Sequence, residues 1–350
     1  MELAFRWFGK DDPIPLEYIK QIPRVSGIVS ALYDVNVGDF WSYEKIKSLK
    51  LFIEKAGLNF SVIESIPVHE DIKIGKKSRD KYIENYCKSI KNAGALGIKV
   101  ICYNFMPVFD WTRSNLSRLN PDGSTSLFYD QVTIEKIDLS KGVMDLPGWA
   151  TSYSNVQLQT LLKAYSKVDE EILWYNLEYF LEKVVPIAEK AGIKLSIHPD
   201  DPPWSIFGLP RIIINEEALD RLVEIIDSPS NGITFCTGSF GPNLQMDLIK
   251  SIYKFGAARK IPFIHVRNIK NVKERTFQEV AHPSEFGDIN IYKVIKALVD
   301  INFQGILRPD HGRMIWGEEG KPGYGLYDRA LGIMYLSGLW EGIQKTIKSD

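Results

Sequence analysis

Four short apolar runs in the second half of the chain each end in a side chain that can bind a metal ion. These side chains are His198, Cys236, His265 and Asp310. Imidazole, thiolate and carboxylate groups together neutralise and orient a divalent cation, and such a set leaves coordination positions open for water or substrate. If the four runs end at the same edge of a sheet, the sequence predicts one catalytic metal site.

Each of these residues also has a simpler interpretation. A lone histidine in an apolar run is more often a hydrogen-bonded core residue. Cys236 alone is more often a small buried hydrophobe, and Asp310 alone resembles a loop cap. The coincidence of all four at equivalent run ends favours the metal site over these separate interpretations.

Further polar residues accompany two of the predicted ligands. His311 follows Asp310 directly, Arg308 precedes Asp310 by two positions, and Arg267 follows His265 by two. Because positions two apart share a face of a strand, each Arg should point the same way as its neighbouring ligand. Guanidinium groups beside a metal suit a carboxylate substrate. Ion pairs with acidic residues elsewhere in the fold are the alternative, and the sequence leaves both open.

A repeated junction marks the elements that would position these residues. At Gly57, Gly97 and Gly192 a helical segment ends in glycine and an apolar, β-branched run begins at once. At each junction the glycine would supply the left-handed residue that closes a helix. The repeat predicts helices that alternate with strands.

Eight runs have strand character: 2–8, 26–33, 59–66, 99–104, 194–198, 233–236, 263–267 and 304–308. Most are almost continuously apolar, which is typical of strands buried on both faces of a parallel sheet. Amphipathic segments are expected to be helices at 43–56, 79–96, 169–191, 216–227, 246–257, 291–299 and 326–343. Asn215 is the expected N-cap of the helix at 216–227. The alternation favours an α/β fold of the (β/α)8 TIM barrel type over a doubly wound open sheet, which would give a similar rhythm.

Two connections are too long for simple loops between a strand and a helix. They are 105–168 after the fourth strand and 269–290 after the seventh. Long connections inside a compact domain usually carry function or shape a site. No segment resembles a linker between domains. We therefore expect a single barrel domain over 1–350, with an insertion at about 105–168.

Two glycine-containing segments are candidates for nucleotide binding. The stretch 317–325, which contains Tyr324, lacks the order of a phosphate-binding loop and is expected to be a mobile lid. The fragment GSFGP at 238–242 is too short for a dinucleotide fingerprint, so no nucleotide cofactor is expected.

His69 and His282 are expected to be surface or loop residues.

Composition excludes several classes of partner. With 43 basic and 44 acidic residues the net charge is -1, so no overall field would attract nucleic acid or anionic lipid. No apolar stretch is long enough for a membrane span or a signal peptide, and three cysteines without CxxC spacing fit a reducing compartment. We expect a cytoplasmic protein that forms a homodimer or a larger homo-oligomer.

Several motifs, taken together, are similar to one known family. The motifs are His198-Pro-Asp-Asp-Pro-Pro with FGLPRI behind it, Phe235-Cys-Thr-Gly-Ser, His265-Val-Arg-Asn, Arg308-Pro-Asp-His-Gly, Pro322-Gly-Tyr, FRWFG, SGIVSALYD and NFMPVFDWTR. They resemble the D-mannonate dehydratases, in order, over nearly the whole chain. No metal-ligand motif departs from the family pattern, and the chain resembles a form without the longer central insertion of some members.

The resemblance implies a xylose-isomerase-like barrel that converts D-mannonate to 2-keto-3-deoxy-D-gluconate and water, in hexuronate (glucuronate) breakdown. It also implies a divalent cation, usually Mn²⁺, with Fe²⁺, Co²⁺ and Mg²⁺ as other candidates. A thiolate ligand would by its softness favour zinc, iron or cobalt. The identity of the metal is therefore implied by the resemblance and not by the ligand types.

Dehydration next to a carboxylate needs a base for the C2 proton and an acid for the departing 3-hydroxyl. His311 and Tyr324 are the candidates, and the sequence does not decide which is the acid. The residues expected to bind the polyol or its carboxylate are Arg6, Trp7, Asn104, Arg267, Asn268 and Arg308. Arg6 and Trp7 could instead close the bottom of the barrel.

Three other functions remain as alternatives. A sugar isomerase or epimerase of the same barrel superfamily also uses a divalent metal, but such sites are rich in carboxylates. A DNA-repair nuclease on a similar barrel would need more metal ligands and a basic groove. A non-catalytic protein would bind the sugar acid without turnover, and an assay for keto-acid product would separate all of these.

Overall fold

Eight parallel strands close into a barrel in the computed structural model, which describes residues 1–139 and 153–349. Around the barrel the order is β1-β12-β9-β8-β7-β4-β3-β2, and β1 pairs with both β2 and β12, which closes the ring. The barrel strands are β1 (Glu2–Arg6), β2 (Val25–Ser30), β3 (Asn59–Glu64), β4 (Val100–Tyr103), β7 (Lys194–Ile197), β8 (Asn231–Cys236), β9 (Phe263–Val266) and β12 (Ile306–Pro309). Each corresponds to one expected run, so the (β/α)8 barrel is confirmed and the open sheet is excluded.

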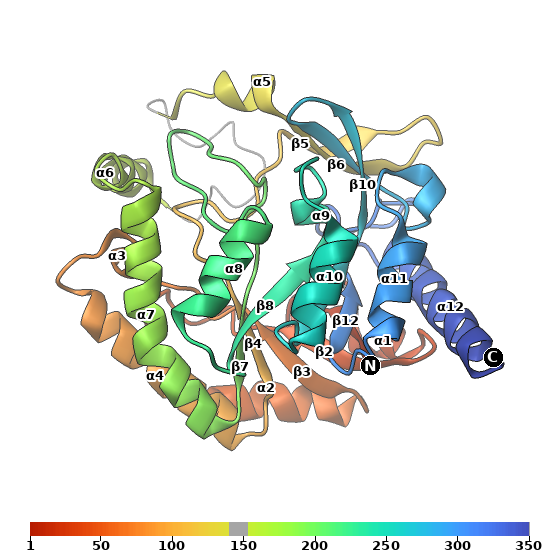
Figure 1. Ribbon diagram of the computed structural model, residues 1–350, viewed down its shortest axis with the longest axis horizontal. Coiled ribbons are helices and arrows are strands. Elements are labelled where there is room, and N and C mark those ends of the chain that lie inside the picture. Colours follow the sequence, from red (N-terminus) through yellow and green to blue (C-terminus); the bar gives the residue numbers. More distant parts are fainter. Residues whose placement is uncertain (140–152, 350) are drawn as a thin grey trace.

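The helices surround the barrel (Figure 1). They are α1 (Leu16–Lys20), α2 (Tyr43–Lys55), α3 (Glu70–Ile74), α4 (Arg79–Ala95), α7 (Glu170–Ala191), α8 (Glu216–Ile225), α9 (Thr237–Phe240), α10 (Leu248–Ala257), α11 (Ile291–Asp300) and α12 (Tyr327–Ser349). The three junction glycines Gly57, Gly97 and Gly192 have φ of 76°, 79° and 66°, the left-handed values expected where a helix turns into a strand. Asn215 caps α8 by accepting a hydrogen bond from Ala218 N, as expected.

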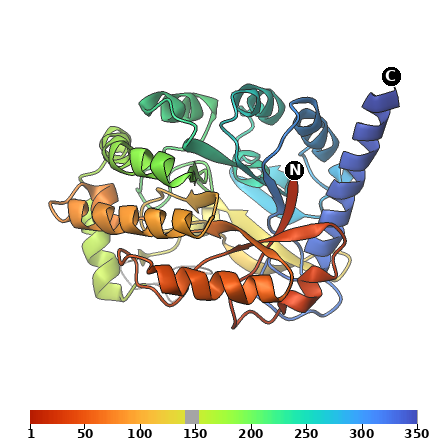
Figure 2. The same cartoon turned by 90° about the horizontal axis from the view of Figure 1, so that it is seen from below.

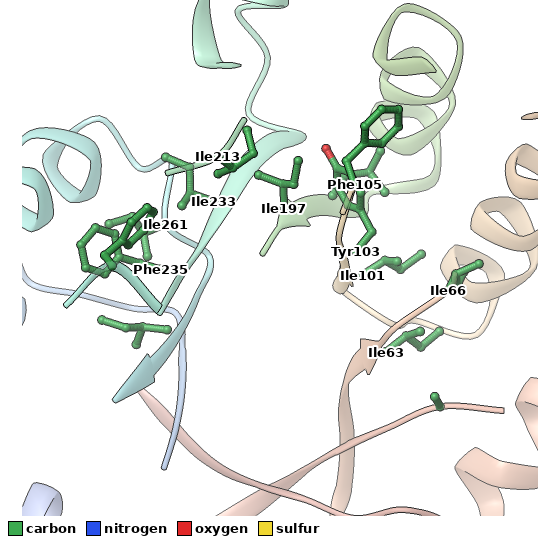
Figure 3. Packing of buried hydrophobic residues seen from close by; sticks show 14 of the residues in the cluster. Ile63, Ile66, Ile101, Tyr103, Phe105, Ile197, Ile213, Ile233, Phe235 and Ile261 are labelled. Atoms are coloured by element: carbon green, nitrogen blue, oxygen red, sulfur yellow. The ribbon is translucent and has the colours of Figure 1, made fainter. Parts of the chain in front are cut away.

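Side chains alternate between the inside and the outside of the barrel wall. Those that face the helices join the large apolar core, and Figure 3 shows Ile63, Ile101, Ile197 and Ile233 from four strands in that layer. The opposite set fills the barrel interior with a separate apolar cluster of Ala4, Val29, Val62, Val100, Cys102, Phe263 and Ile306. Because strand side chains alternate, the residues two positions beyond this cluster also face inward, at the mouth of the barrel.

The two long connections form a second, smaller sheet where the sequence predicted only long loops. The first contains β5 (Asn115–Leu119), β6 (Thr125–Asp130), α5 (Gln131–Glu135) and α6 (Asn155–Tyr165), and the second contains β10 (Asn268–Lys273), β11 (Thr276–Val280) and the 3-10 helix η3 (Ser284–Phe286). The sheet has the order β10-β11-β6-β5, and its strands are antiparallel. Figure 1 shows β5, β6 and β10 together beyond one end of the barrel strands. Residues 140–152 of the predicted insertion lie outside the described residues.

The small sheet shares its apolar core with the barrel. The rings of Tyr129 in β6 and Phe277 in β11 stack with 5.3 Å between their centroids, and both belong to the core that also contains the helix-facing strand residues. We therefore propose that the chain folds as one domain. Figure 2 shows α12 running along the outside of the barrel to the C-terminus. Among the described residues, no helix combines the length and the apolar character needed to span a bilayer.

Candidate active site and metal centre

The four predicted ligands come from adjacent strands and face the barrel interior. His198 follows β7, Cys236 ends β8, His265 lies in β9 and Asp310 follows β12. One ligand atom from each of His198, Cys236 and His265 lies within 4.8 Å of the others. Asp310 Oδ2 lies 3.5 Å from Cys236 Sγ. The structure thus brings all four side chains together at the mouth.

The local hydrogen bonds leave the histidine nitrogens free for a cation. His198 Nδ1 lies 2.7 Å from Pro199 O, and because a carbonyl can only accept, Nδ1 carries the proton and Nε2 keeps its lone pair. His265 Nε2 is buried, and no contact within the described residues gives it a hydrogen bond; Glu64 Oε2, at 3.4 Å, is near it without hydrogen-bond geometry. A buried nitrogen without a partner is costly, and a bound cation would satisfy it. The donor set therefore fits a divalent metal ion.

Two arginines neutralise the carboxylate at this site. Arg308 Nη1 lies 2.9 Å from Asp310 Oδ1, and Arg267 Nε lies 3.1 Å from Asp310 Oδ2. Burial alone would raise the pKa of Asp310, but His311, Arg308 and Arg267 together hold that pKa well below its usual range. Asp310 is therefore ionised at neutral pH, as a metal ligand must be.

His311 and Tyr324 form a hydrogen-bonded pair next to the predicted ligands. His311 Nε2 lies 2.9 Å from the Tyr324 hydroxyl, and both residues are buried. The Tyr324 ring also packs edge-on against Phe8 of the segment after β1. Burial and the cation Arg267 lower the pKa of His311, and burial raises the pKa of Tyr324. At neutral pH the pair is thus an uncharged imidazole beside a protonated phenol.

A pocket of about 340 Å³ opens at this end of the barrel. His198, Asp310, His311 and Tyr324 line it. Among the residues expected to bind substrate, Arg6, Asn104 and Arg308 also line it. Arg6 and Asn104 lie at the ends of strands that open toward the mouth, so Arg6 does not close the bottom of the barrel.

Two of the residues expected to bind substrate point away from the pocket. Trp7 is buried in the apolar core, where its indole N–H donates to Ile14 O over 3.1 Å. The Asn268 side chain joins two backbone segments, since it donates to Pro283 O and accepts from Ile289 N. Each of them directly follows an inward-facing residue, Arg6 or Arg267. Because successive side chains of a strand point to opposite faces, Trp7 and Asn268 point away from the barrel interior.

Known proteins share both the sequence and the fold of this chain. The sequence profile of the family described as D-mannonate dehydratase (UxuA) matches residues 1–350. The chain belongs to the D-mannonate dehydratase family. This membership makes it an enzyme of the hydro-lyase class.

Individual relatives agree with the profile. The mannonate dehydratase of Streptococcus agalactiae serotype Ia is 54% identical over 348 residues, which are 99% of this chain and 100% of the relative. Mannonate dehydratase 2 of Halalkalibacterium halodurans is 56% identical over 343 residues, 98% of this chain and 99% of the relative. The crystal structure of mannonate dehydratase from Streptococcus suis serotype 2 is 50% identical and superposes with a TM-score of 0.93, covering 99% of this chain and 96% of that chain.

More distant structures share the fold alone. A xylose isomerase domain protein from Planctomyces limnophilus is 12% identical with a TM-score of 0.56, covering 100% of this chain and 99% of that chain. A D-tagatose 3-epimerase-like protein is 14% identical, also with a TM-score of 0.56, covering 99% of this chain and 100% of that chain. The dehydratase therefore has the xylose-isomerase-like barrel that its motifs implied.

The dehydratase also contains an acidic pocket residue that the sequence analysis missed. Glu64, the last residue of β3, lines the pocket; its Oε1 lies 2.9 Å from Arg308 Nη2, and its Oε2 lies 3.4 Å from His265 Nε2. Burial would raise the pKa of Glu64, but Arg308, His265 and Arg6 hold that pKa well below its usual range. The signal for Glu64 is its position: like the predicted ligands, it is a metal-competent side chain at the carboxyl end of a barrel strand.

A buried ion cluster joins the small sheet of the dehydratase to the barrel mouth. It consists of Arg113, Asp201, Arg267 and Glu279, each at most 1% exposed. Arg113 lies 2.7 Å from both Asp201 Oδ1 and Glu279 Oε1, and Arg267 contacts the same two carboxylates. Glycine at 238 makes room for Arg267, because a Cβ there would collide with the Arg267 side chain. Arg267 is thus held in ion pairs behind the pocket. Of the two roles that the sequence left open, contact with a carboxylate substrate and ion pairing with acidic residues, the structure shows the ion pairs.

Removing one member of this cluster should destabilise the dehydratase strongly. Replacing Arg113 with Met leaves two buried carboxylates with Arg267 as their one remaining cation in the cluster, and breaking a buried ion pair in this way costs about 3–5 kcal/mol. Urea unfolding of Arg113→Met and the parent enzyme measures the difference in the free energy of unfolding.

A surface pair provides the matched control. Arg221 contacts Glu171 through two 2.8 Å hydrogen bonds, but both side chains are exposed. Arg221→Met should therefore cost at most about 1 kcal/mol. Equal losses in the two variants would show that the buried cluster contributes no more to stability than a surface ion pair.

The two remaining histidines differ in how they match expectation. His69 is the N-cap of α3, where its Nδ1 accepts from Asp71 N, and it lies outside the pocket. His282 was expected to be a surface or loop residue; it lies in the loop after β11, and its side chain is buried there, 2% exposed. Its ring packs against α12 at Gly332, where a Cβ would lie 2.5 Å from Nδ1.

Proposed function

We propose that the enzyme removes water from D-mannonate to give 2-keto-3-deoxy-D-gluconate, with one divalent cation, in the breakdown of hexuronates such as glucuronate. The observation that carries the proposal is the convergence of His198, Cys236 and His265 within 4.8 Å, beside the His311–Tyr324 pair. Family membership supports the substrate, and the site supports the metal dependence.

His198, Cys236, His265 and Asp310 would hold the cation. When bound there, a divalent ion acts as a Lewis acid that stabilises negative charge on the substrate carboxylate or 2-hydroxyl. We propose Mn²⁺ as the native ion, as the family resemblance implies, with Fe²⁺, Co²⁺ and Mg²⁺ as substitutes. The thiolate of Cys236 would favour the softer ions among these.

The contacts of His311 favour Tyr324 as the general acid. Arg267 Nη1 lies 2.6 Å from His311 Nδ1, and Glu279 Oε1 lies 3.3 Å from the same nitrogen. Because the guanidinium contact is the shorter one and a guanidinium can only donate, we assign Nδ1 as the acceptor. The His311 proton then resides on Nε2 and is donated to the Tyr324 oxygen at 2.9 Å. The phenol proton is left to point into the pocket, toward the departing 3-hydroxyl. His311 Nε2–H would stabilise the phenolate that forms, and the proton lost from C2 of the substrate would pass to that phenolate, which restores the phenol as water leaves.

The cationic pocket residues would bind and orient the sugar acid. Arg6 and Arg308 line the pocket together with Asn104. Arg308 is shared between Glu64 and Asp310, so its guanidinium is fixed in place before a substrate arrives. A fixed donor loses little conformational entropy on binding a carboxylate or hydroxyl.

We also propose that the enzyme is cytoplasmic and acts as a homo-oligomer, in the simplest case a dimer. The free thiols Cys87, Cys102 and Cys236 fit a reducing compartment. Exposed apolar side chains follow one another along α12 at Tyr327, Leu331 and Met334, and such a stripe suits contact between copies.

A turnover assay tests the proposed function. The enzyme is incubated with D-mannonate, and the 2-keto acid is measured before metal removal, after treatment with a chelator and after Mn²⁺ is restored. We expect product in the first and third samples and its loss in the second. Conversion between an aldose and a ketose would indicate the isomerase alternative. Binding of D-mannonate without turnover would indicate a sugar-acid carrier. Full turnover after complete metal removal would refute the metal-dependent mechanism.

A further inference from the structure

Tyr324 lies in a connection that has little regular structure of its own. The connection runs from β12 to α12, and its backbone is irregular around Gly323, which has φ of 78°. The peptide of Gly312 donates to Gly323 O over 2.8 Å, and Glu318 Oε2 accepts from Leu326 N over 2.6 Å. The Tyr324 N–H donates to Lys321 O over 2.8 Å, but none of these contacts holds the Tyr324 carbonyl. The position of its phenol therefore also depends on what fixes that carbonyl.

One arginine makes that contact. Arg329, in the first turn of α12, donates from Nη2 to Tyr324 O over 2.6 Å and from Nε to Gly325 O over 2.7 Å. Its Nη1 donates to Arg6 O, at the end of β1, over 3.1 Å. The guanidinium also lies over the Phe5 ring, 4.0 Å from its centroid. One planar group thus joins the Tyr324 backbone to the barrel strand that carries Arg6.

The arrangement is energetically costly for the fold. Arg329 is fully buried, and its hydrogen bonds within the described residues go to carbonyls and not to a carboxylate. Burial lowers the pKa of Arg329 to about 9, so its positive charge is harder to hold there than in water. A cation at the N-terminus of a helix also opposes the helix dipole. A neutral apolar residue would pack α12 against the barrel without these costs.

We propose that Arg329 is a positioning residue for dehydration: it fixes the backbone of Tyr324 relative to β1, so that the phenol meets His311 and faces the pocket. The inference rests on the proposed role of Tyr324 as the acid. The planar fork of an arginine reaches three carbonyls in fixed directions, and lysine offers a single ammonium on a flexible stem. A displacement of about 1 Å in a reacting group can cost roughly 10²-fold in rate.

A double-mutant cycle tests the proposal. The variants are Arg329→Lys, Tyr324→Phe and the double variant, each assayed for kcat and KM per folded, metal-loaded molecule. We expect Arg329→Lys to lower kcat by about 10–10²-fold with little change in KM. In the Tyr324→Phe background the same substitution should have almost no further effect, because a misplaced phenol cannot matter once its hydroxyl is gone.

A second arginine gives the matched control for helix anchoring. Arg24 Nη1 donates to Ser337 Oγ over 2.9 Å, so it holds α12 farther along the helix, away from Tyr324. Arg24→Lys should keep kcat. Added methylguanidinium should restore part of the kcat of Arg329→Ala, which keeps the test valid if the lysine variant folds poorly.

The outcomes separate this inference from the proposed function. Suppose that Tyr324→Phe is impaired and that the loss of kcat in the double variant is the product of the losses in the two single variants. Arg329 then has only a structural role, and the role of Tyr324 as the acid stands. An Arg24→Lys variant as impaired as Arg329→Lys would also reduce Arg329 to a helix anchor. A fully active Tyr324→Phe would overturn both the acid assignment and the positioning role.

Discussion

Tyr324→Phe should lower kcat by about 10²–10⁴-fold, the usual contribution of a single proton transfer. The substitution removes the hydroxyl that lies 2.9 Å from His311 Nε2 and keeps the ring that packs against Phe8. The pocket and the metal ligands should be unchanged, so KM and metal content should stay close to those of the parent enzyme. Steady-state kinetics on metal-loaded protein, with metal content measured on the same sample, provide the comparison.

His311→Asn should be impaired for a related reason. Asparagine removes the imidazole N–H that would stabilise the tyrosine oxygen, although it preserves a polar side chain of smaller size. Tyr327→Phe is the matched control: it removes a hydroxyl three residues further along the chain, from a side chain that is 41% exposed. Full activity in Tyr324→Phe or in His311→Asn would remove that residue from the mechanism.

The second large effect is expected at Cys236. In Cys236→Ala the affinity for the divalent ion should fall by more than about 100-fold, because loss of an outer-shell partner alone typically costs 10–100-fold. Turnover at limiting metal should be lost with it. The affinity is measured by titrating metal-free protein with Mn²⁺ and following activity and bound metal together.

Cys102 offers a matched control within the same barrel. It is also buried and faces the interior from β4, where it lies 3.3 Å from Thr234 Oγ1, but it is not part of the ligand cluster. Cys102→Ser should therefore bind the metal as the parent enzyme does. If both cysteine variants bound Mn²⁺ with parental affinity, Cys236 would not be a ligand.

The barrel could be predicted from sequence because its signals are local. Each junction glycine closes a helix within its own segment, and most of the strands are almost continuously apolar runs. Strand parity then places His265 and Arg308 on the inner face without any knowledge of the rest of the fold. The same parity turns Trp7 and Asn268 away from the pocket, so the sequence already contained the reason for their placement.

The small sheet could not be predicted in the same way. Its strand β5 is mostly exposed, and its pairing joins β6 to β11, which lie far apart in the chain. Such pairing is fixed by tertiary contacts, and local sequence carries little information about it. The partnership of Arg113 with Glu279 is a consequence of that pairing, and neither residue lies at the end of a barrel strand.

The proposed metal centre requires that side chains from four barrel strands meet around one cation, with the thiolate of Cys236 bound to it. X-ray absorption at the metal edge of the zinc-loaded enzyme tests this most directly. We predict one metal ion per chain with a sulfur neighbour at about 2.3 Å, the length of a zinc–thiolate bond, and the loss of that neighbour in Cys236→Ser. A metal shell of oxygen and nitrogen alone in the parent enzyme would contradict this arrangement.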